Sequence, residues 1–353
     1  MSSFPEVAVV GFAQSPQVRE TTGTTNGVEM LVPVFQRVLA ETGLSRREVG
    51  FWCSGSSDYL AGRAFSFVSA VDAIGALPPI AESHVESDAA WALYEAWVKI
   101  RTGEVDTALV YGFGKSSAGD LRRVLALQLD PYLVAPLWPD SVSIAALQAR
   151  LGIDAGLWSE KEMAEVAARS RAAAATNPNA QLRDPVDPDT LLDTPYLADP
   201  LRAHDCAPIT DGAAAIVLAA GHRAAELCDR PAWITGLEHR VDSPALGARD
   251  LSRAPSAGAA GAAAGISGVQ VAELSAPFTS QELLLRRELG LSEDVVINPS
   301  GGPLCGNPMF AGGLVRIGEA ASRVMSGEAG KVLGHASNGP LLQQNLICVM
   351  EGR

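Results

Sequence analysis

Strand-like and helix-like stretches alternate along this chain, and that alternation most limits how it can fold. Residues 8–13 form an apolar strand pattern, and apolar residues follow at helical spacing from Val28 to Val38, ending at Gly43. The same order of elements returns in the second half, beginning at "AWITGLEHRV". A layered α/β protein has this pattern, and its two similar series predict an internal structural duplication.

One stretch breaks the alternation. Residues 117–159 show neither a clean period nor a good cap pattern, and we expect an inserted loop region there. A helix follows at Ser159, where Glu162 stands three residues on as in a capping box. The predicted division is therefore an N-terminal half of residues 1–116 and 160–228, and a C-terminal half of residues 229–353.

Composition excludes several classes of protein. The net charge of −13 and the pI near 4.9 argue against nucleic acid or an anionic membrane as a principal partner. The longest apolar stretches, around 213–220 and 257–265, are far too short for a membrane span, and the N-terminus lacks a basic signal region. The 5 cysteines are scattered and form no CxxC pair, so we expect reduced thiols, no metal site and a cytoplasmic protein.

The segment "INPSGGPLCGNPMFAGG" lies between an apolar strand and a helical run. Its glycines and prolines mark a tight loop in which the backbone comes close to another group. Loops at this place in α/β proteins commonly carry chemistry. The polar residue at its centre is Asn307, which cannot act as a general acid or base.

Three further stretches are interpreted together with this loop as sequence motifs: "SEKEMAEVAARSRAAAATNPNAQLR", "YLADPLRAHDCAPITDGAAAIVLAA" and "VAELSAPFTSQELLLRRELGL". Together the four resemble motifs of the thiolase superfamily, and the nearest branch is that of sterol-carrier-protein-x and lipid-transfer-protein thiolase-like proteins. The resemblance covers most of the chain. It rests on the combination, because each motif alone is weak.

The resemblance implies a thiolase-like α/β fold of two duplicated βαβαβαββ halves packed in five layers, α-β-α-β-α. It also implies coenzyme A thioesters as substrates, with no further cofactor. The expected assembly is a homodimer, or a heterodimer with a thiolase-like paralogue. Members of the branch are aldol-lyases that shorten steroid side chains, often bound to a small zinc-ribbon/OB-fold protein.

The chain departs from the family where the catalytic residues should be. The stretch that matches the nucleophilic cysteine carries Glu86, Ser87 and Asp88 instead, and none of these replaces a thiolate. The family histidine of "HDCF", or its asparagine in other members, falls on Ser275. The family histidine of the "GHP" motif falls on Asn307. A cysteine-based Claisen cycle is therefore not expected.

The remaining candidates each have a functional and a structural interpretation. His335 lies at the end of a late strand and has the pKa range of a general base, although it could instead be a half-buried structural histidine. Asn307 could donate to an enolate oxygen or stabilise its own turn. Ser275 is a weaker polar candidate, and Asp88 an acid or a helix cap. The backbone N–H groups of four glycines could form an oxyanion hole: Gly301, Gly302, Gly312 and Gly313.

Weaker candidates are Cys305 as a relocated nucleophile and His84, while Arg122, Arg123 and Arg202 could contact coenzyme A phosphates. Three functions stay open. The first is retro-aldol cleavage of a β-hydroxyacyl-CoA, with a steroid-like side chain, by His335 and Asn307. The second is a non-catalytic subunit of a heteromeric complex. The third is a cysteine-dependent acyltransferase.

Overall fold

The computed structural model describes residues 4–22, 27–59 and 65–353, which form one 11-stranded mixed sheet and a two-stranded hairpin. The N-terminal part of the sheet contains β1 (Val7–Gln14), β2 (Phe51–Gly55), β3 (Glu82–Val85), β4 (Thr107–Lys115) and β7 (Ile209–Ala220). Their spatial order is β3-β2-β4-β7-β1. Strand β2 is parallel to β3 and β4, whereas β7 is antiparallel to β4 and β1.

The C-terminal part repeats this arrangement. It contains β8 (Ala232–Val241), β9 (Val271–Glu273), β10 (Val296–Ile297), β12 (Lys331–Asn338) and β13 (Gln344–Glu351). Their order, β10-β9-β12-β13-β8, again places the third, second, fourth, fifth and first strands side by side. Strand β9 is parallel to β10 and β12, and β13 is antiparallel to β12 and β8. The predicted duplication is confirmed.

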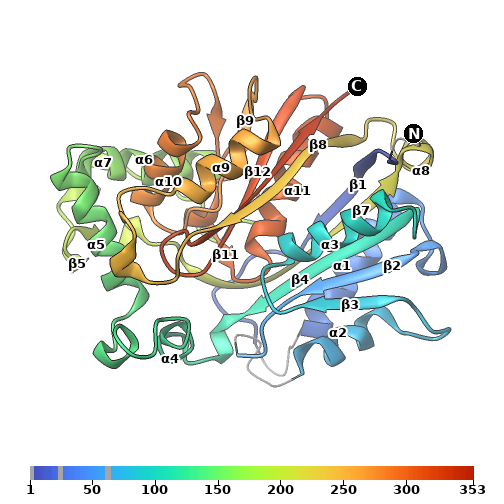
Figure 1. The fold of residues 1–353 in the computed structure, drawn as a ribbon, viewed down its shortest axis with the longest axis horizontal. Helices are drawn as coiled ribbons and strands as arrows, with labels where there is room; N and C mark the ends of the chain where they lie inside the picture. Colours follow the sequence, from blue (N-terminus) through green and yellow to red (C-terminus); the bar gives the residue numbers. More distant parts are fainter. Residues whose placement is uncertain (1–3, 23–26, 60–64) are drawn as a thin grey trace.

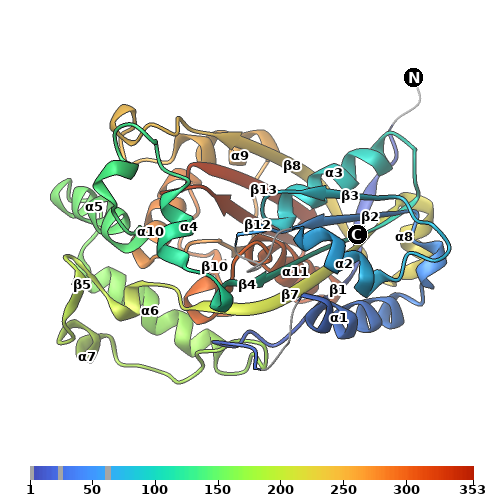
Figure 2. The same cartoon turned by 90° about the horizontal axis from the view of Figure 1, so that it is seen from below.

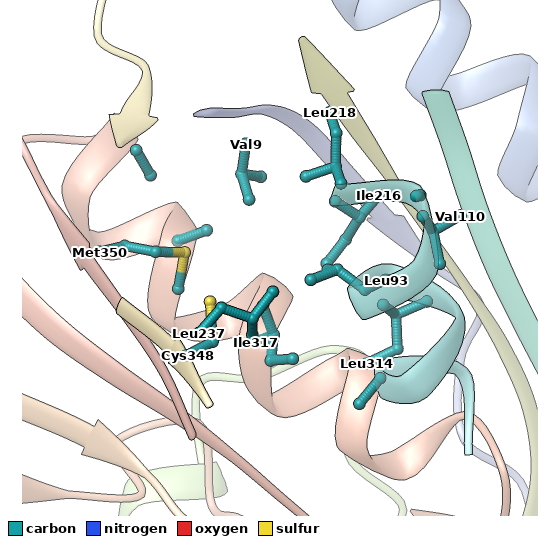
Figure 3. Packing of buried hydrophobic residues seen from close by; sticks show 14 of the residues in the cluster. Val9, Leu93, Val110, Ile216, Leu218, Leu237, Leu314, Ile317, Cys348 and Met350 are labelled. Atoms are coloured by element: carbon teal, nitrogen blue, oxygen red, sulfur yellow. The ribbon is translucent and has the colours of Figure 1, made fainter. Parts of the chain in front are cut away.

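The two parts share a central helix layer. They join edge to edge where β1 pairs with β8, with Ala8 opposite Trp233 and Val9 opposite Ala232. Helices α3 (Ala89–Arg101) and α11 (Gly312–Met325) lie between the facing surfaces of the two parts. Figure 3 shows Leu93 of α3 and Ile317 of α11 among buried side chains from strands of both parts. The largest apolar core therefore belongs to both halves together.

Further helices cover the outer faces (Figures 1 and 2). Helices α1 (Gly27–Thr42) and α2 (Ser66–Ile74) pack against the N-terminal strands, and α9 (Pro255–Ala264) and α10 (Thr279–Glu288) against the C-terminal ones. This gives the five predicted layers. Because both sheet faces are covered, central strands such as "GAAAIVLAA" are apolar throughout.

The connection from β4 to β7 is largely helical. It includes α4 (Leu121–Ala126), α5 (Ser141–Asp154), α6 (Glu160–Ala174) and α7 (Pro188–Leu192), followed by the hairpin of β5 (Tyr196–Ala198) and β6 (Leu201–Arg202). The loop prediction is wrong for α4 and α5. Asp140 caps α5 by accepting a hydrogen bond from Ser143 N at 2.8 Å. The capping box of Ser159 and Glu162 is confirmed. Helices α5 and α6 contact α10, so this connection covers the C-terminal half, while the proposed half boundaries stay a prediction. In the ranges described, no helix is both long and apolar enough to cross a membrane.

Candidate functional site

A cavity of about 530 Å³ lies where helices α3 and α11 begin. One polar group in its lining consists of Asp88, Ser275, Asn307, Ser337 and Asn338, and the lining also contains the polar residues Arg122, Gln128, Asp140, Ser141 and Gln281. An apolar wall is formed by Leu125, Leu129, Val142, Ile144, Phe278, Met309, Phe310, Leu341 and Leu342. Four of these apolar residues come from the connection between β4 and β7, so the segment interpreted as a loop supplies part of the cavity. The cavity thus joins one polar group of side chains to a large apolar surface.

Asp88 connects the two central helices. One carboxylate oxygen, Oδ1, accepts from Ala90 N at 2.9 Å and so caps α3, while Oδ2 accepts from Gly313 N at 2.9 Å in the first turn of α11. Burial raises the pKa of Asp88, against the opposing effect of the backbone N–H groups of Ala90, Gly313 and Leu314. A raised pKa makes the ionised carboxylate a stronger proton acceptor than an exposed aspartate.

Gly313 allows this contact. A Cβ atom at position 313 would lie 2.5 Å from Asp88 Oδ1 and 2.5 Å from the Ala336 Cβ atom. Any side chain there would push the carboxylate away from the start of α11. The glycine of the sequence motif is therefore needed for the approach of the two helices.

Asn307 lies in β11 (Asn307–Pro308), which pairs in parallel with β7. Its side-chain amide lines the cavity and makes no hydrogen bond to any residue in the described ranges. A turn-stabilising asparagine would bond its own backbone, so the structural interpretation is not supported. The free amide can donate to a ligand oxygen.

Ser275 follows β9 and also lines the cavity. Ser337 Oγ donates to Ser275 O at 2.9 Å and lies 3.2 Å from Ser275 Oγ. Asn338 Nδ2, on the same side of the cavity, donates to Ser87 Oγ at 2.7 Å. We predicted no site role for Ser337 or Asn338 from the sequence, although both belong to the stretch "GHASNGP".

His335 does not line the cavity, which corrects its predicted role as general base. The ring is fully buried, with Nδ1 accepting from Ser275 N at 3.2 Å and Nε2 lying 3.0 Å from Asn345 Oδ1. Asn345 Nδ2 donates to Ser256 Oγ and to Leu342 O, so Oδ1 must face the imidazole and Nε2 must carry the proton. Burial lowers the pKa of His335 to about 4, against the opposing effect of the hydrogen bond that Nε2 donates to Asn345 Oδ1. Both nitrogens are engaged, so neither can take a proton from a substrate.

Gly301 and Gly302 also lie away from the cavity, whereas Gly312 and Gly313 line it. The first pair adopts φ values of 98° and 64°, and a Cβ atom there would meet Ala174 at 2.6 Å or Asn298 at 2.8 Å. Their role is to let the loop turn against these neighbours. The oxyanion-hole prediction for Gly301 and Gly302 is thus corrected. The N–H of Gly313 already donates to Asp88 Oδ2, so of Gly312 and Gly313 the prediction remains for Gly312 alone.

Two thiols bear on the acyltransferase hypothesis. Cys305 is fully buried against Ala174 and Ala180, outside the cavity, and burial raises its pKa to about 11. Cys206 lines the cavity, which the sequence did not single out, although it lies in the motif "DCAPITDG". Burial, together with the negative charges of Asp205 and Asp140, raises its pKa to about 12. No histidine in the described ranges lines the cavity, so neither thiol has a base that would form the thiolate.

The other sequence candidates lie outside the polar group. His84 contacts Ser54 Oγ at 2.9 Å and Glu86 at 3.6 Å, on strands β2 and β3. Arg202 pairs with Glu160 at 2.5 Å, whereas Arg122 lines the cavity and Arg123 does not. Within the described ranges, no cluster of three or more histidine, cysteine or acidic residues is arranged to hold a metal ion.

Comparison with known proteins gives the fold a name. The chain is 27% identical over 284 residues to an acetyl-CoA acetyltransferase of Methanothermobacter thermautotrophicus, with 72% of this chain and 74% of the relative covered. The structure superposes at a TM-score of 0.81 on a structure titled "Ltp2-ChsH2(DUF35) aldolase", at 19% identity and with 98% of each chain covered. The chain has the thiolase fold.

Two acyl-transferring enzymes support the same conclusion. An acetyl-CoA acetyltransferase of Bacillus anthracis has a TM-score of 0.81 at 17% identity over 100% of both chains. Human mitochondrial 3-ketoacyl-CoA thiolase has a TM-score of 0.81 at 15% identity over 99% of this chain and 100% of the other. No family model matches the chain. The resemblance predicted from the motifs is thus confirmed as a shared thiolase fold, found among both aldolases and acyltransferases.

Proposed function

We propose that this protein is an acyl-CoA carbon–carbon lyase that cleaves a β-hydroxyacyl-CoA by a retro-aldol reaction. The observation that carries the proposal is the joint presence of Asp88 and the unpaired amide of Asn307 on one cavity, where the one thiol among the described lining residues, Cys206, has a raised pKa. Such a pair suits a reaction that needs a base and an oxyanion donor but no acyl-enzyme. Asp88 replaces His335 as the proposed base.

The reaction follows from these two groups. The Asp88 carboxylate takes the proton of the β-hydroxyl, the oxygen forms a carbonyl, and the bond between the α and β carbons breaks. Its electron pair forms the thioester enolate, whose oxygen accepts a hydrogen bond from Asn307 Nδ2. The proton on Asp88 then returns to the α carbon, which releases a shortened acyl-CoA and a ketone or aldehyde.

The apolar wall supports a bulky acyl group as substrate. Leu125, Ile144, Phe278 and Leu342 lie around a cavity of about 530 Å³, a volume typical of pockets that bind drug-sized ligands. The aldolase structure with the same fold names two proteins, Ltp2 and ChsH2. We extend the proposal to a sterol-like side chain, and to an assembly with a paralogue or a small zinc-ribbon/OB-fold partner.

Turnover of branched β-hydroxyacyl-CoA substrates tests the proposal, with thioester and carbonyl products measured by mass spectrometry. Asp88→Asn should lower kcat by about 10²–10⁴-fold, because the amide cannot take the hydroxyl proton. Asn307→Ala should lower kcat by about 10²–10³-fold. The control Cys305→Ala should retain activity, since Cys305 is outside the cavity. An acyl group trapped on Cys206 would contradict the mechanism.

A second function is favoured by one observation. Both oxygens of Asp88 already accept backbone hydrogen bonds, as in a purely structural helix cap. The chain would then be a non-catalytic subunit beside an active thiolase-like paralogue. Activity that appears only in the pair, survives Asp88→Asn and is abolished by mutating the paralogue would favour this alternative.

A further inference from the structure

A hydrogen-bond chain runs from the cavity into the C-terminal half. Ser275 N donates to His335 Nδ1, His335 Nε2 donates to Asn345 Oδ1 at 3.0 Å, and Asn345 Nδ2 donates to Ser256 Oγ at 2.7 Å. Ser256 Oγ then donates to Asp242 Oδ2 at 2.6 Å. His335 and Asn345 are fully buried, and neither contacts the cavity. The mechanism proposed above uses neither of them.

The hydrogen-bond chain reaches the wall of the cavity at two places. One is Ser275, between β9 and α10. The other is Leu342 in the turn between β12 and β13, whose carbonyl accepts from Asn345 Nδ2 at 2.8 Å. Leu341 and Leu342 both have φ of 56°, a left-handed conformation that non-glycine residues rarely adopt. Surrounding contacts must hold such a turn in place.

We infer that the pair of His335 and Asn345 is a positioning device that fixes the distance between these two walls and so sets which acyl groups the cavity accepts. The imidazole is suited to this because it offers one acceptor and one donor on opposite sides of a rigid ring. Leucine at this position would leave Ser275 N and Asn345 Oδ1 buried without partners. The part of the inference that concerns acyl groups rests on the function proposed above.

Hydrogen exchange followed by mass spectrometry tests the positioning role without any ligand. In His335→Leu, exchange should rise by about tenfold in residues 275–279 and 339–343, but not in α5. His335→Gln should stay within about twofold of wild type, because its amide can also accept and donate. Faster exchange throughout the protein, or no rescue by glutamine, would overturn the inference.

Ser256→Ala provides a milder variant should His335→Leu fail to fold. It keeps the imidazole and removes the group that holds Asn345, so exchange in residues 339–343 should rise by about threefold. Unchanged exchange there would count against the device.

Binding of two stable thioether analogues of acyl-CoA tests the effect on specificity. In His335→Leu, the affinity for a bulky branched acyl chain should fall about tenfold more than the affinity for an acetyl chain, as measured by calorimetry. Equal losses would show that the pair does not set acyl preference. Wild-type protein that binds neither analogue would contradict the proposed substrate class, and the exchange experiment would still decide whether the two walls are positioned by this pair.

Discussion

The two halves of the molecule have the same strand order but differ in the polar groups that they bury. In the N-terminal half, residues 1–116 and 160–228, four Asp, Glu, Lys, Arg or His side chains are buried among the described residues: Asp88, Arg202, Asp205 and Asp211. The C-terminal half, residues 229–353, buries four such side chains: Glu273, Glu282, Arg316 and His335. The halves therefore differ in the kind of charge that they bury and not in the number: among the described residues, only the C-terminal half contains an ion pair buried on both sides, between Glu273 and Arg316.

The buried charges of the C-terminal half hold its loops. Glu273 accepts from Ser300 N at 2.9 Å and from Arg316 at 2.9 Å, while Glu282 accepts from Asn298 Nδ2 at 2.9 Å. Asn298 itself has φ of 49°. In the N-terminal half, one helix cap is enough to place Asp88. A satisfied polar network can thus specify loop geometry around a site whose fold is already determined by apolar packing.

The largest effect should come from breaking the buried ion pair. Arg316→Met leaves the Glu273 carboxylate buried without its cation, which should lower the free energy of unfolding by about 3–5 kcal/mol. Urea denaturation measures this loss. The double variant Arg316→Met, Glu273→Gln removes the unpaired charge and should recover a large part of it; a double variant as unstable as the single one would mean that the charge pair is not the cause.

The second-largest effect is expected in the pH dependence of stability, because His335 is buried as a neutral ring. The pKa of His335 is about 4 in the folded protein, against 6.5 for an ordinary histidine. At a pH between these two values, the unfolded chain therefore binds a proton on His335 that the folded protein does not bind. The stability contributed by the neutral ring is complete above pH 6.5 and is lost as the pH falls towards 4, by about 3 kcal/mol. Denaturation of wild type and His335→Gln across this range should diverge accordingly. Parallel curves would contradict the burial of His335.

Gly313 lies where the two halves meet at Asp88. Gly313→Ala should lower the free energy of unfolding by about 2 kcal/mol, because the new methyl group overlaps Asp88 and Ala336. Gly312→Ala is the matched control, since its Cβ atom would meet only Asn307 Oδ1, at 3.1 Å. Thermal unfolding of both variants compares them, and equal losses would argue against a close contact at position 313.

The smallest effect on stability is expected at Asn307. Its amide has no partner in the described ranges, so Asn307→Ala should change the free energy of unfolding by less than about 0.5 kcal/mol. The loss of activity should nevertheless be large, as proposed above. A marked loss of stability would place Asn307 with the loop-holding residues rather than with the site.

The sequence predicted the fold well and the site only in part. Periodicity predicted the duplication, and the family resemblance of the motifs implied the layers. The motifs also singled out Asp88, Ser275, Asn307, Gly312 and Gly313, which line the cavity, while their roles stay predictions. They could not show that His335 is buried, because strand position does not reveal which partners surround a ring. Cys206 was not placed on the cavity for a similar reason: its neighbours come from segments far away in the chain. Helix α5 was missed because we did not recognise Asp140 as its cap.

The shared helix layer has a consequence for the way this architecture could have arisen. The apolar faces of α3 and α11 are covered only when both halves are present, and the strand pairing between the halves is short among the described residues, with two residue pairs between β1 and β8 and two between β11 and β7. A single half made as an independent polypeptide would expose a broad hydrophobic surface and should associate with a second copy of itself. An ancestor of half this length would therefore have needed to form a symmetric homodimer. Gene fusion would then have allowed the two copies to diverge in sequence.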